Sequence, residues 1–306
     1  MTALWRIVLI SILGIIITHS VLSQPLLNEA ERARNQQNRL KTVNVYSLKL
    51  NKDIDKRTFL DHKLSYDQEG KLLEQTYYDS TDLEMLKWTN IYNSRQQLSE
   101  RIFCVYRDTI AETVFHYAGN GSLIEEITQN ADGVLFSKIS YNCDSKGKII
   151  SSREEIFPEL QPYLHQAYKF DQQGYLLLRF LGESKFHVEH NFKYQYARNG
   201  LLEKITEAGH DTVPFGWIIY DYERDGLPKA FTVKHENGKM YKVYYSYDNH
   251  QGLKSESRNF YLNTLLLDQE KSEFTNDAKG NIKKQLKYRK NNELSVLYNY
   301  TYEYYE

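Results

Sequence analysis

The sequence has little cysteine, little proline and no excess of either charge. Its 306 residues include only 2 Cys and 5 Pro, and 39 Lys and Arg balance 40 Asp and Glu. Two cysteines far apart in the chain exclude a disulfide-dense scaffold and a zinc site built on four cysteines or on a closely spaced pair. The near-neutral charge argues against a phosphate-neutralising surface, so we expect no nucleic-acid partner.

Long apolar runs are also missing, and the longest one lies at the N-terminus. It covers residues 7–17, which is shorter than the roughly 20 residues that a membrane-spanning helix needs. Arg6 precedes it, and Val21 and Ser23 occupy the −3 and −1 positions that signal peptidases favour. We therefore predict a signal peptide over 1–23, export to the periplasm, the outer surface or the medium, and no transmembrane helix in the mature chain. Residues 24–41 predict a linker or short helix.

Tyrosine and phenylalanine are abundant, with 26 and 13 copies, and they recur in a repeat with a period near 26 residues. Each copy has an aromatic residue, an acid or small polar residue, two further residues, Gly, any residue and an aliphatic residue, as in YDQEGKL from Tyr66 and FDQQGYL from Phe170. The leading positions are Tyr66, Tyr92, Tyr117, Cys143, Phe170, Tyr196, Tyr222, Tyr247, Asn276 and Tyr302. Such regularity predicts a repeat domain over 42–306.

The polar and glycine positions of the motif predict tight turns. An acid can accept hydrogen bonds from the turn backbone, and Gly three residues later supplies a left-handed conformation. The residues with this structural role are Asp67, Gly70, Gly121, Asp144, Gly147, Asp171, Gly174, Gly200, Gly226 and Gly280. Gln96 replaces Gly in the second copy and Gly252 is displaced by one residue, so we expect these two turns to differ in shape.

Each repeat has room for two strands of about eight residues and a second turn. Val188, His190 and Phe192 alternate with Glu189 and Asn191, so one face of the predicted strand is apolar and aromatic while the other is polar and faces solvent. The fold class is therefore all-β, an antiparallel hairpin-repeat meander of roughly 20 strands. Because open sheets rarely exceed about 10 strands without curling, we expect a coiled or solenoid-like sheet with the aromatic face inside.

The motif resembles the YD repeats of the Rhs and teneurin group, whose core is Tyr-Asp, two residues, Gly, any residue and then an aliphatic residue or Arg. The resemblance covers residues 64–306, and its best matches start at Tyr66, Cys143 and Phe170. It implies spiralling antiparallel sheets, which in that family sometimes close as shells. The chain also looks like the small secreted repeat proteins of Bacteroidetes-type bacteria.

Candidate chemistry is sparse. His187 and His190 have a spacing that suggests metal ligands, but they face opposite sides of a strand, so we predict no metal site, no cofactor and no catalytic residues. Cys104 and Cys143 should be three strands apart and therefore free. Irregular loops at 157–163 and 207–217 should emerge on one edge of the sheet. The predicted binding residues in and near them are Tyr163, His210, Asp211, Phe215 and Trp217.

These observations favour an exported, non-enzymatic repeat scaffold that binds an envelope protein or a glycan. Three alternatives stay open. One is an enzyme whose site is built from the 157–163 and 207–217 loops, and another is a purely structural spacer. The third is an outer-membrane β-barrel, against which Glu189, Lys193, Lys242 and Lys283 count because they lie on the non-aromatic face.

Overall fold

The computed structural model describes residues 32–49, 58–157, 161–183, 188–209, 214–249 and 251–306, and nearly all of them lie in antiparallel strands. A short helix covers 32–37, and a 3-10 helix, η1, covers Lys290–Asn292. The strands are β1 Leu40–Lys49, β2 Thr58–Tyr66, β3 Leu72–Tyr78, β4 Glu84–Tyr92, β5 Leu98–Val105, β6 Asp108–Tyr117, β7 Leu123–Gln129, β8 Leu135–Cys143, β9 Ile149–Ile156, β10 Gln161–Phe170, β11 Leu176–Glu183, β12 Val188–Tyr196, β13 Leu202–Ala208, β14 Pro214–Tyr222, β15 Pro228–His235, β16 Lys239–Tyr247, β17 Leu253–Leu262, β18 Leu265–Asn276, β19 Ile282–Arg289 and β20 Glu293–Tyr304.

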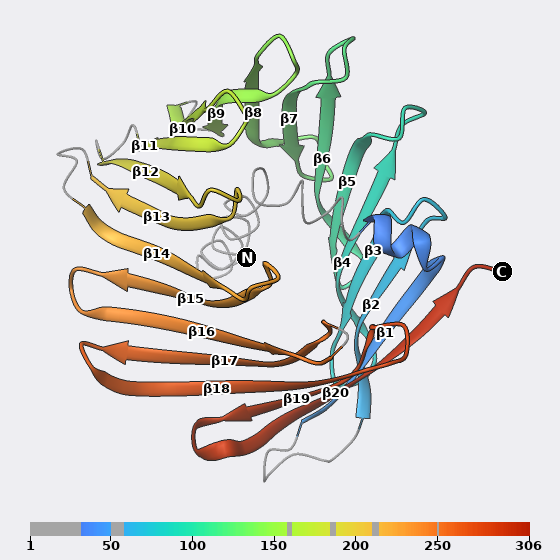
Figure 1. Ribbon diagram of the computed structural model, residues 1–306. Coiled ribbons are helices and arrows are strands. Elements are labelled where there is room, and N and C mark those ends of the chain that lie inside the picture. The colour runs from blue at the N-terminus through green and yellow to red at the C-terminus, as the bar shows by residue number, and fades with distance from the viewer. Residues whose placement is uncertain (1–31, 50–57, 158–160, 184–187, 210–213, 250) are drawn as a thin grey trace, which may run out of the picture.

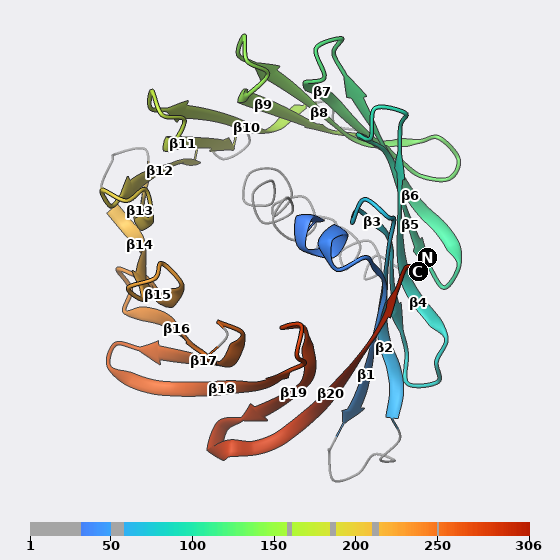
Figure 2. The same cartoon turned by 45° about the vertical axis from the view of Figure 1, so that its right-hand side comes forward.

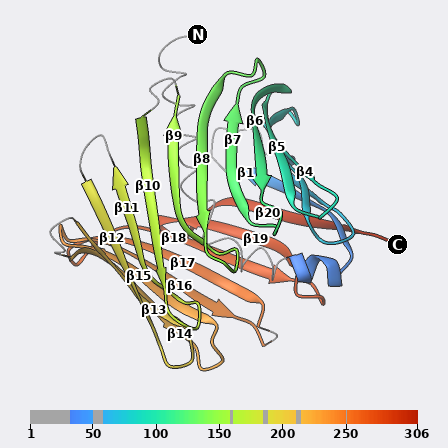
Figure 3. The ribbon, with the colours of Figure 1, turned by 90° about the horizontal axis from the view of Figure 1, so that it is seen from above.

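The sheet closes on itself as a barrel. Each strand pairs with its neighbours in sequence, and β1 pairs with both β2 and β20 in a 20-stranded sheet. Figures 1 and 2 show the strands as a ring, and in Figure 3 the strands β4–β6 lie across the molecule from β11–β14. The coiled or solenoid-like arrangement predicted from the sequence is therefore wrong, although the all-β class and the strand number are confirmed. Closure pairs the two edge strands that a solenoid would leave exposed.

The repeat motif forms the turns at one end of the barrel, here called the motif rim. In the first turn, the backbone N–H of Asp67 donates to the carbonyl of Lys71, and that of Gly70 donates to the carbonyl of Asp67 at 3.1 Å. The Asp67 carboxylate accepts from the N–H of Lys71 at 2.8 Å. Gly70 has φ of 77°, the left-handed conformation that a side chain disfavours.

The two turns that lack Gly at this position have the same shape as the others. Gln96 and Gln251 both adopt φ of 64°, and each donates its N–H to the carbonyl three residues earlier, as Gly70 does. The sequence-based expectation that these turns differ is wrong. Glutamine accepts the left-handed conformation there at a steric cost that glycine avoids.

The leading residue of the motif joins successive repeats through its side chain. Tyrosine hydroxyls donate to the backbone carbonyl about twenty residues earlier on the neighbouring hairpin. These bonds are Tyr92 to Leu72, Tyr117 to Leu98, Tyr196 to Leu176, Tyr222 to Leu202, Tyr247 to Pro228 and Tyr302 to Ile282, at 2.6–3.0 Å. Cys143 and Asn276 make the equivalent contact through Sγ and Nδ2. We call this series the tyrosine ladder.

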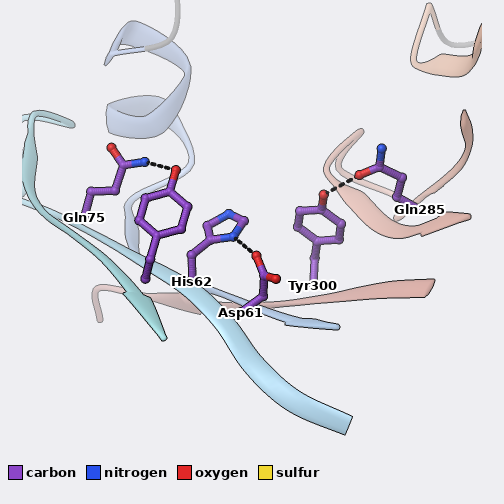
Figure 4. Close-up of polar contacts among 6 residues, drawn as sticks. Asp61, His62, Gln75, Gln285 and Tyr300 are labelled. Atoms are coloured by element: carbon purple, nitrogen blue, oxygen red, sulfur yellow. Dashed lines mark hydrogen bonds and ion pairs between the residues drawn. The ribbon is translucent and has the colours of Figure 1, made fainter. Parts of the chain in front are cut away.

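The two faces of the wall differ in chemistry. The helix over 32–37 lies within the ring, and His62 and Tyr300 point to the side on which that helix lies (Figures 2 and 4). The inner face is rich in aromatic residues, and its best buried cluster joins Val43 and Val45 to tyrosines of β20. It also has the ion pair of Arg258 with Glu256, which lie opposite Val243 and Tyr245. The outer face carries ion pairs such as Glu74–Lys87 at 2.7 Å. This polarity makes the lumen the place to seek a site.

Candidate functional site on the inner wall

The binding residues predicted from the sequence are placed only in part. Tyr163 lies in β10, but its side chain is outside the described part of the chain, as are His210 and Asp211. Phe215 and Trp217 lie in β14. The Phe215 ring contacts the His190 ring edge-on, with 5.6 Å between the ring centroids. Trp217 lies opposite Thr206 and Lys234 on the neighbouring strands, in a row of side chains that face outward. The two aromatic residues therefore do not form one surface.

A β-bulge in β2 brings Asp61 and His62 together on the inner wall. Val45 is opposite His62, while the next residue of β1 is opposite Leu60, so Asp61 has no partner across the strand pair. A bulge changes the direction of a side chain that would otherwise point to the opposite face of the sheet, and here it places Asp61 on the same face as His62. His62 Nδ1 lies 2.9 Å from Asp61 Oδ2, and both side chains are about a quarter exposed (Figure 4).

The Asp61 carboxylate lies among tyrosines. Burial raises the pKa of Tyr300 to about 12, and the charges of Tyr298 and Asp61 add to this effect. Burial and then Asp61 also raise the pKa of Tyr298. The Tyr300 hydroxyl donates to Gln285 at 2.9 Å, as Figure 4 shows. These phenols are hydrogen-bond donors that stay neutral at physiological pH.

A row of rings continues from His62 along the wall. His62 stacks on Tyr77 at 5.3 Å, Tyr77 meets Trp88 edge-on at 5.8 Å, and Trp88 stacks on Phe103 at 4.8 Å. Each ring contacts the next, so the row packs the wall as aromatic residues pack a core.

A second histidine–carboxylate pair lies about half the ring away. His190 Nδ1 is 3.0 Å from Glu207 Oε1, and the His190 ring stacks on Phe192 at 6.3 Å. A cavity of about 50 Å³ next to it is lined by Phe192, Glu207, Gly216, Trp217, His235 and neighbouring aliphatic residues. With the two pairs on opposite parts of the wall, a molecule in the lumen would have polar groups on both sides.

An acidic cluster lies between these two pairs, on β7, β8 and β9. We define it as Glu126, Tyr141 and Glu154. The Tyr141 hydroxyl donates to Glu126 Oε1 at 2.7 Å, while Glu154 is only 7 % exposed. Burial raises the pKa of both carboxyl groups. Arg101 on β5 is also deeply placed, and its Nε donates to Asn90.

The histidines and cysteines of the described ranges do not cluster. These ranges contain no group of three or more His, Cys, Asp or Glu side chains able to hold a metal ion. Cys104 and Cys143 are both free and half-buried. His187 falls outside the described residues, and His190 has Glu207 as its partner.

The inner-wall residues carry no motif, so they cannot be recognised from a sequence pattern. The alternation of inward and outward side chains along a strand reveals two of them. Glu126 and Glu154 lie opposite Ile139 on its two neighbouring strands, and therefore share its inward face. An acid at an inward, otherwise apolar position is a recognisable anomaly. The bulge at Asp61 has no such signal, because nothing local distinguishes it from regular strand.

Comparison with known proteins identifies no family. No family model matches the chain, and no curated protein does. Among solved structures, a chain of the TcdB2-TccC3-TEV crystal structure is 12 % identical with a TM-score of 0.36, over 81 % of this chain and 16 % of that one. This chain thus spans about a sixth of that protein.

Two porin-like proteins are also similar in outline. The one from Bacteroides uniformis is 12 % identical with a TM-score of 0.36, over 86 % of this chain and 98 % of its own. The one from Bacteroides vulgatus is 12 % identical with a TM-score of 0.34. The closed barrel fits the outer-membrane alternative better than it fits an open binding scaffold. In the described part of the chain, no helix has the length and apolarity to cross a membrane.

Proposed function

We propose that this chain is an exported barrel scaffold of the bacterial envelope that holds a guest molecule, a protein segment or a glycan, in its lumen. The observation that carries the proposal is the inner wall, where buried aromatic and aliphatic side chains surround polar groups such as the Asp61–His62 pair. The outer face has ion pairs such as Glu74–Lys87. Such a wall is suited to water outside and to a bound molecule inside. The YD-repeat resemblance and the signal segment support export and a scaffold role.

The lumen is wide enough for a guest. Twenty strands with a spacing of about 4.8 Å make a circumference of at least roughly 96 Å, and so a diameter of about 30 Å. Wall side chains fill a barrel of about eight strands but not one of this size.

The outer face argues against burial in lipid. Lys87 pairs with Glu74, and Lys138 pairs with Glu125 at 2.5 Å, in the middle parts of their strands. A lysine facing the centre of a bilayer costs about 2–4 kcal/mol. Several such residues around the ring would make insertion unfavourable.

The second candidate is an outer-membrane barrel, and closure of the sheet favours it. A closed, even-numbered, antiparallel barrel is the architecture that bacterial outer-membrane proteins share. Fractionation separates the two candidates. A scaffold stays in the aqueous fraction without detergent, whereas a membrane barrel follows the outer-membrane fraction and resists extraction by sodium carbonate.

Capture with a blocked lumen tests the leading proposal. Thr128 faces inward opposite Thr113, and the adjacent Ile127 faces outward opposite Lys138. In a background with Cys104→Ser and Cys143→Ser, we would label Thr128→Cys or Ile127→Cys with a maleimide polyethylene glycol and apply envelope extract to each immobilised protein. We expect the inward label to abolish recovery of a guest and the outward label to leave it. Equal recovery by both would place the ligand outside the lumen and refute the proposal.

The enzyme alternative stays a prediction. Residues 158–160 and 210–213 of its two loops lie outside the described part of the chain. A spacer role would predict that neither labelled protein recovers a saturable guest.

A further inference from the structure

The inner wall has a hollow where Gly216 of β14 lacks a side chain, here called the Gly216 hollow. Glu207 of β13 and His235 of β15 lie opposite Gly216 on its two sides, so the three residues form one row across the wall. The hollow measures about 50 Å³, which is room for one small group such as a methyl and not for a ring. All the residues that line it belong to the described part of the chain. Glycine inside a strand often marks a place where a ligand approaches the backbone closely.

The walls of the hollow are apolar. The next row along the same face supplies three aliphatic side chains, from Ile205, Ile218 and Val233. The ring of Phe192 lies on the β12 side. Water gains little in a space with such walls, whereas an apolar group that fills it is stabilised by the burial of its surface. A methyl group is the occupant that matches both the size and the walls of the hollow.

Two polar atoms face the position of the missing side chain. A Cβ on Gly216 would lie 3.0 Å from Glu207 Oε2 and 3.7 Å from His235 Nδ1. The other carboxylate oxygen, Oε1, contacts His190 Nδ1 at 3.0 Å, and no residue in the described ranges donates a hydrogen bond to Oε2. The side chain of His235 is exposed. A group seated over Gly216 therefore has an acceptor on one side and an imidazole on the other.

His190 holds the Glu207 carboxylate in place. Its ring stacks on Phe192 with the centroids 6.3 Å apart, and it contacts Phe215 edge-on at 5.6 Å. Phe215 has no partner on β13, because the register slips between Glu207 and the residue after it, and a bulge of this kind changes where a side chain points. The packed rings fix the imidazole and so fix the oxygen that faces the hollow. Such pre-organisation reduces the entropy that a ligand loses on binding.

We propose that the Gly216 hollow binds the acetamido group of an N-acetylated amino sugar. This inference rests on the proposed function, because it names the guest in the lumen as a glycan. A planar trans amide carries its methyl group and its N–H on the same side, with the carbonyl oxygen on the other. The methyl group can therefore enter the hollow while the N–H donates to Glu207 Oε2. The carbonyl oxygen then accepts a hydrogen bond from the ring of His235.

The closed sheet favours a sugar over a peptide as the carrier of this group. A peptide is commonly recognised when its backbone pairs with a free strand edge. Closure pairs β1 with β20, so the described strands offer no such edge. A sugar needs only side-chain contacts, since it presents hydroxyl groups and apolar C–H faces. The wall beside the hollow supplies both kinds of contact, with the His190–Glu207 pair and the rings that pack on it.

The test compares two neutral sugars on the whole exported protein by saturation-transfer NMR. They are methyl N-acetyl-β-D-glucosaminide and methyl β-D-glucoside, in which a hydroxyl group replaces the acetamido group. We expect the acetylated sugar to bind at least about tenfold more tightly, because it buries one methyl group and makes one more hydrogen bond. Its acetyl methyl should receive the strongest saturation. The N-propionyl analogue is one methylene longer and should bind about tenfold more weakly than the acetylated sugar.

Gly216→Ala should abolish the preference for the acetylated sugar, because the new Cβ occupies the hollow and crowds Glu207 Oε2. The matched control is Gly119→Ala in a turn of the motif rim, where an added Cβ meets nothing within 4 Å, and it should keep the preference. Thermal melting establishes that both variants fold. If Gly216→Ala does not fold, Val233→Ile replaces it, because it adds one methyl group to the wall of the hollow.

Three outcomes overturn the inference. The first is equal affinity for the two sugars or no measurable binding of either, and the second is a preference that Gly216→Ala retains. The third is binding of Nα-acetyl-L-alanine methylamide as tightly as the acetylated sugar, since a peptide would then be the occupant. In each case the capture experiment with the labelled lumen decides the proposed function separately. A guest that the inward label excludes and the outward label does not would leave that function standing.

Discussion

The hydroxyl of Tyr117 donates a hydrogen bond to the backbone carbonyl of Leu98, 2.8 Å away on the preceding hairpin. The same bond recurs from repeat to repeat as the tyrosine ladder. It explains why the leading position of the motif favours tyrosine over phenylalanine, because the ring alone would pack but would leave the carbonyl without this donor. The ladder therefore ties consecutive hairpins at the motif rim.

We predict that Tyr117→Phe lowers the free energy of unfolding by about 1 kcal/mol, the usual net worth of one hydrogen bond. Tyr92→Phe should cost less. The Leu72 carbonyl that Tyr92 contacts also accepts from Asn90 Nδ2 at 3.0 Å, and so keeps one donor. Urea unfolding of both variants checks the order, and equal or reversed losses would show that ring packing outweighs the hydroxyl.

The ladder and the turns could be anticipated from the sequence, whereas closure could not. Repeat spacing, the acid and the glycine all report local geometry between residues a few positions apart. Closure depends on β1 meeting β20, for example Val43 opposite Tyr302, which are at opposite ends of the repeat domain. Cumulative twist over 20 strands decides whether those edges meet, and no single repeat encodes it.

We predict that Gln251→Gly raises the free energy of unfolding by about 0.5–1 kcal/mol. Gln251 has φ of 64°, and the left-handed conformation costs a side chain about 1–2 kcal/mol, part of which the flexibility of glycine in the unfolded chain offsets. The control is Gly226→Ala, at φ of 89° with its nearest neighbour atom 3.9 Å from the added Cβ, which should lose stability from strain alone. Thermal melting measures both. A loss in Gln251→Gly beyond the worth of the exposed hydrogen bond that Gln251 Nε2 donates to Asp225 at 3.3 Å would contradict the strain argument.

Gly70 should be less tolerant of a side chain than the other turn glycines, because the helix over 32–37 packs on it. A Cβ there would lie 2.4 Å from the carbonyl oxygen of Arg32, whereas one on Gly280 would meet nothing within 4 Å. Their φ values, 77° and 81°, are nearly equal, so backbone strain cancels in the comparison.

We therefore predict that Gly70→Ala costs about 2 kcal/mol more than Gly280→Ala, the cost of overpacking a close contact. Urea unfolding followed by tryptophan fluorescence measures the difference. Equal losses in the two variants would mean that the helix moves away from the motif rim at little cost.

The inner-wall chemistry was less accessible to sequence reasoning than the turns. Asp61 and His62 share a face only because the register slips between Val45 and the residue after it. Glu154 carries no motif, and its burial depends on Tyr141 and other residues that lie beside it only after the sheet forms. Both features are tertiary consequences of pairing.

The stability of the protein should depend on pH through Glu154. The folded-state pKa of Glu154 lies above its ordinary value of 4.5, mainly because burial penalises the charged form. The folded state therefore binds the proton more tightly than the unfolded state, and the stability of the native protein falls as pH rises from 4.5 through the folded pKa. Glu154→Gln is always neutral and escapes this loss. We expect the variant to melt near the native temperature below pH 4 and above it at pH 7, whereas Glu155→Gln should follow the native profile. A Glu154→Gln variant that is less stable at pH 7 would show that the Glu154 carboxylate has a stabilising partner.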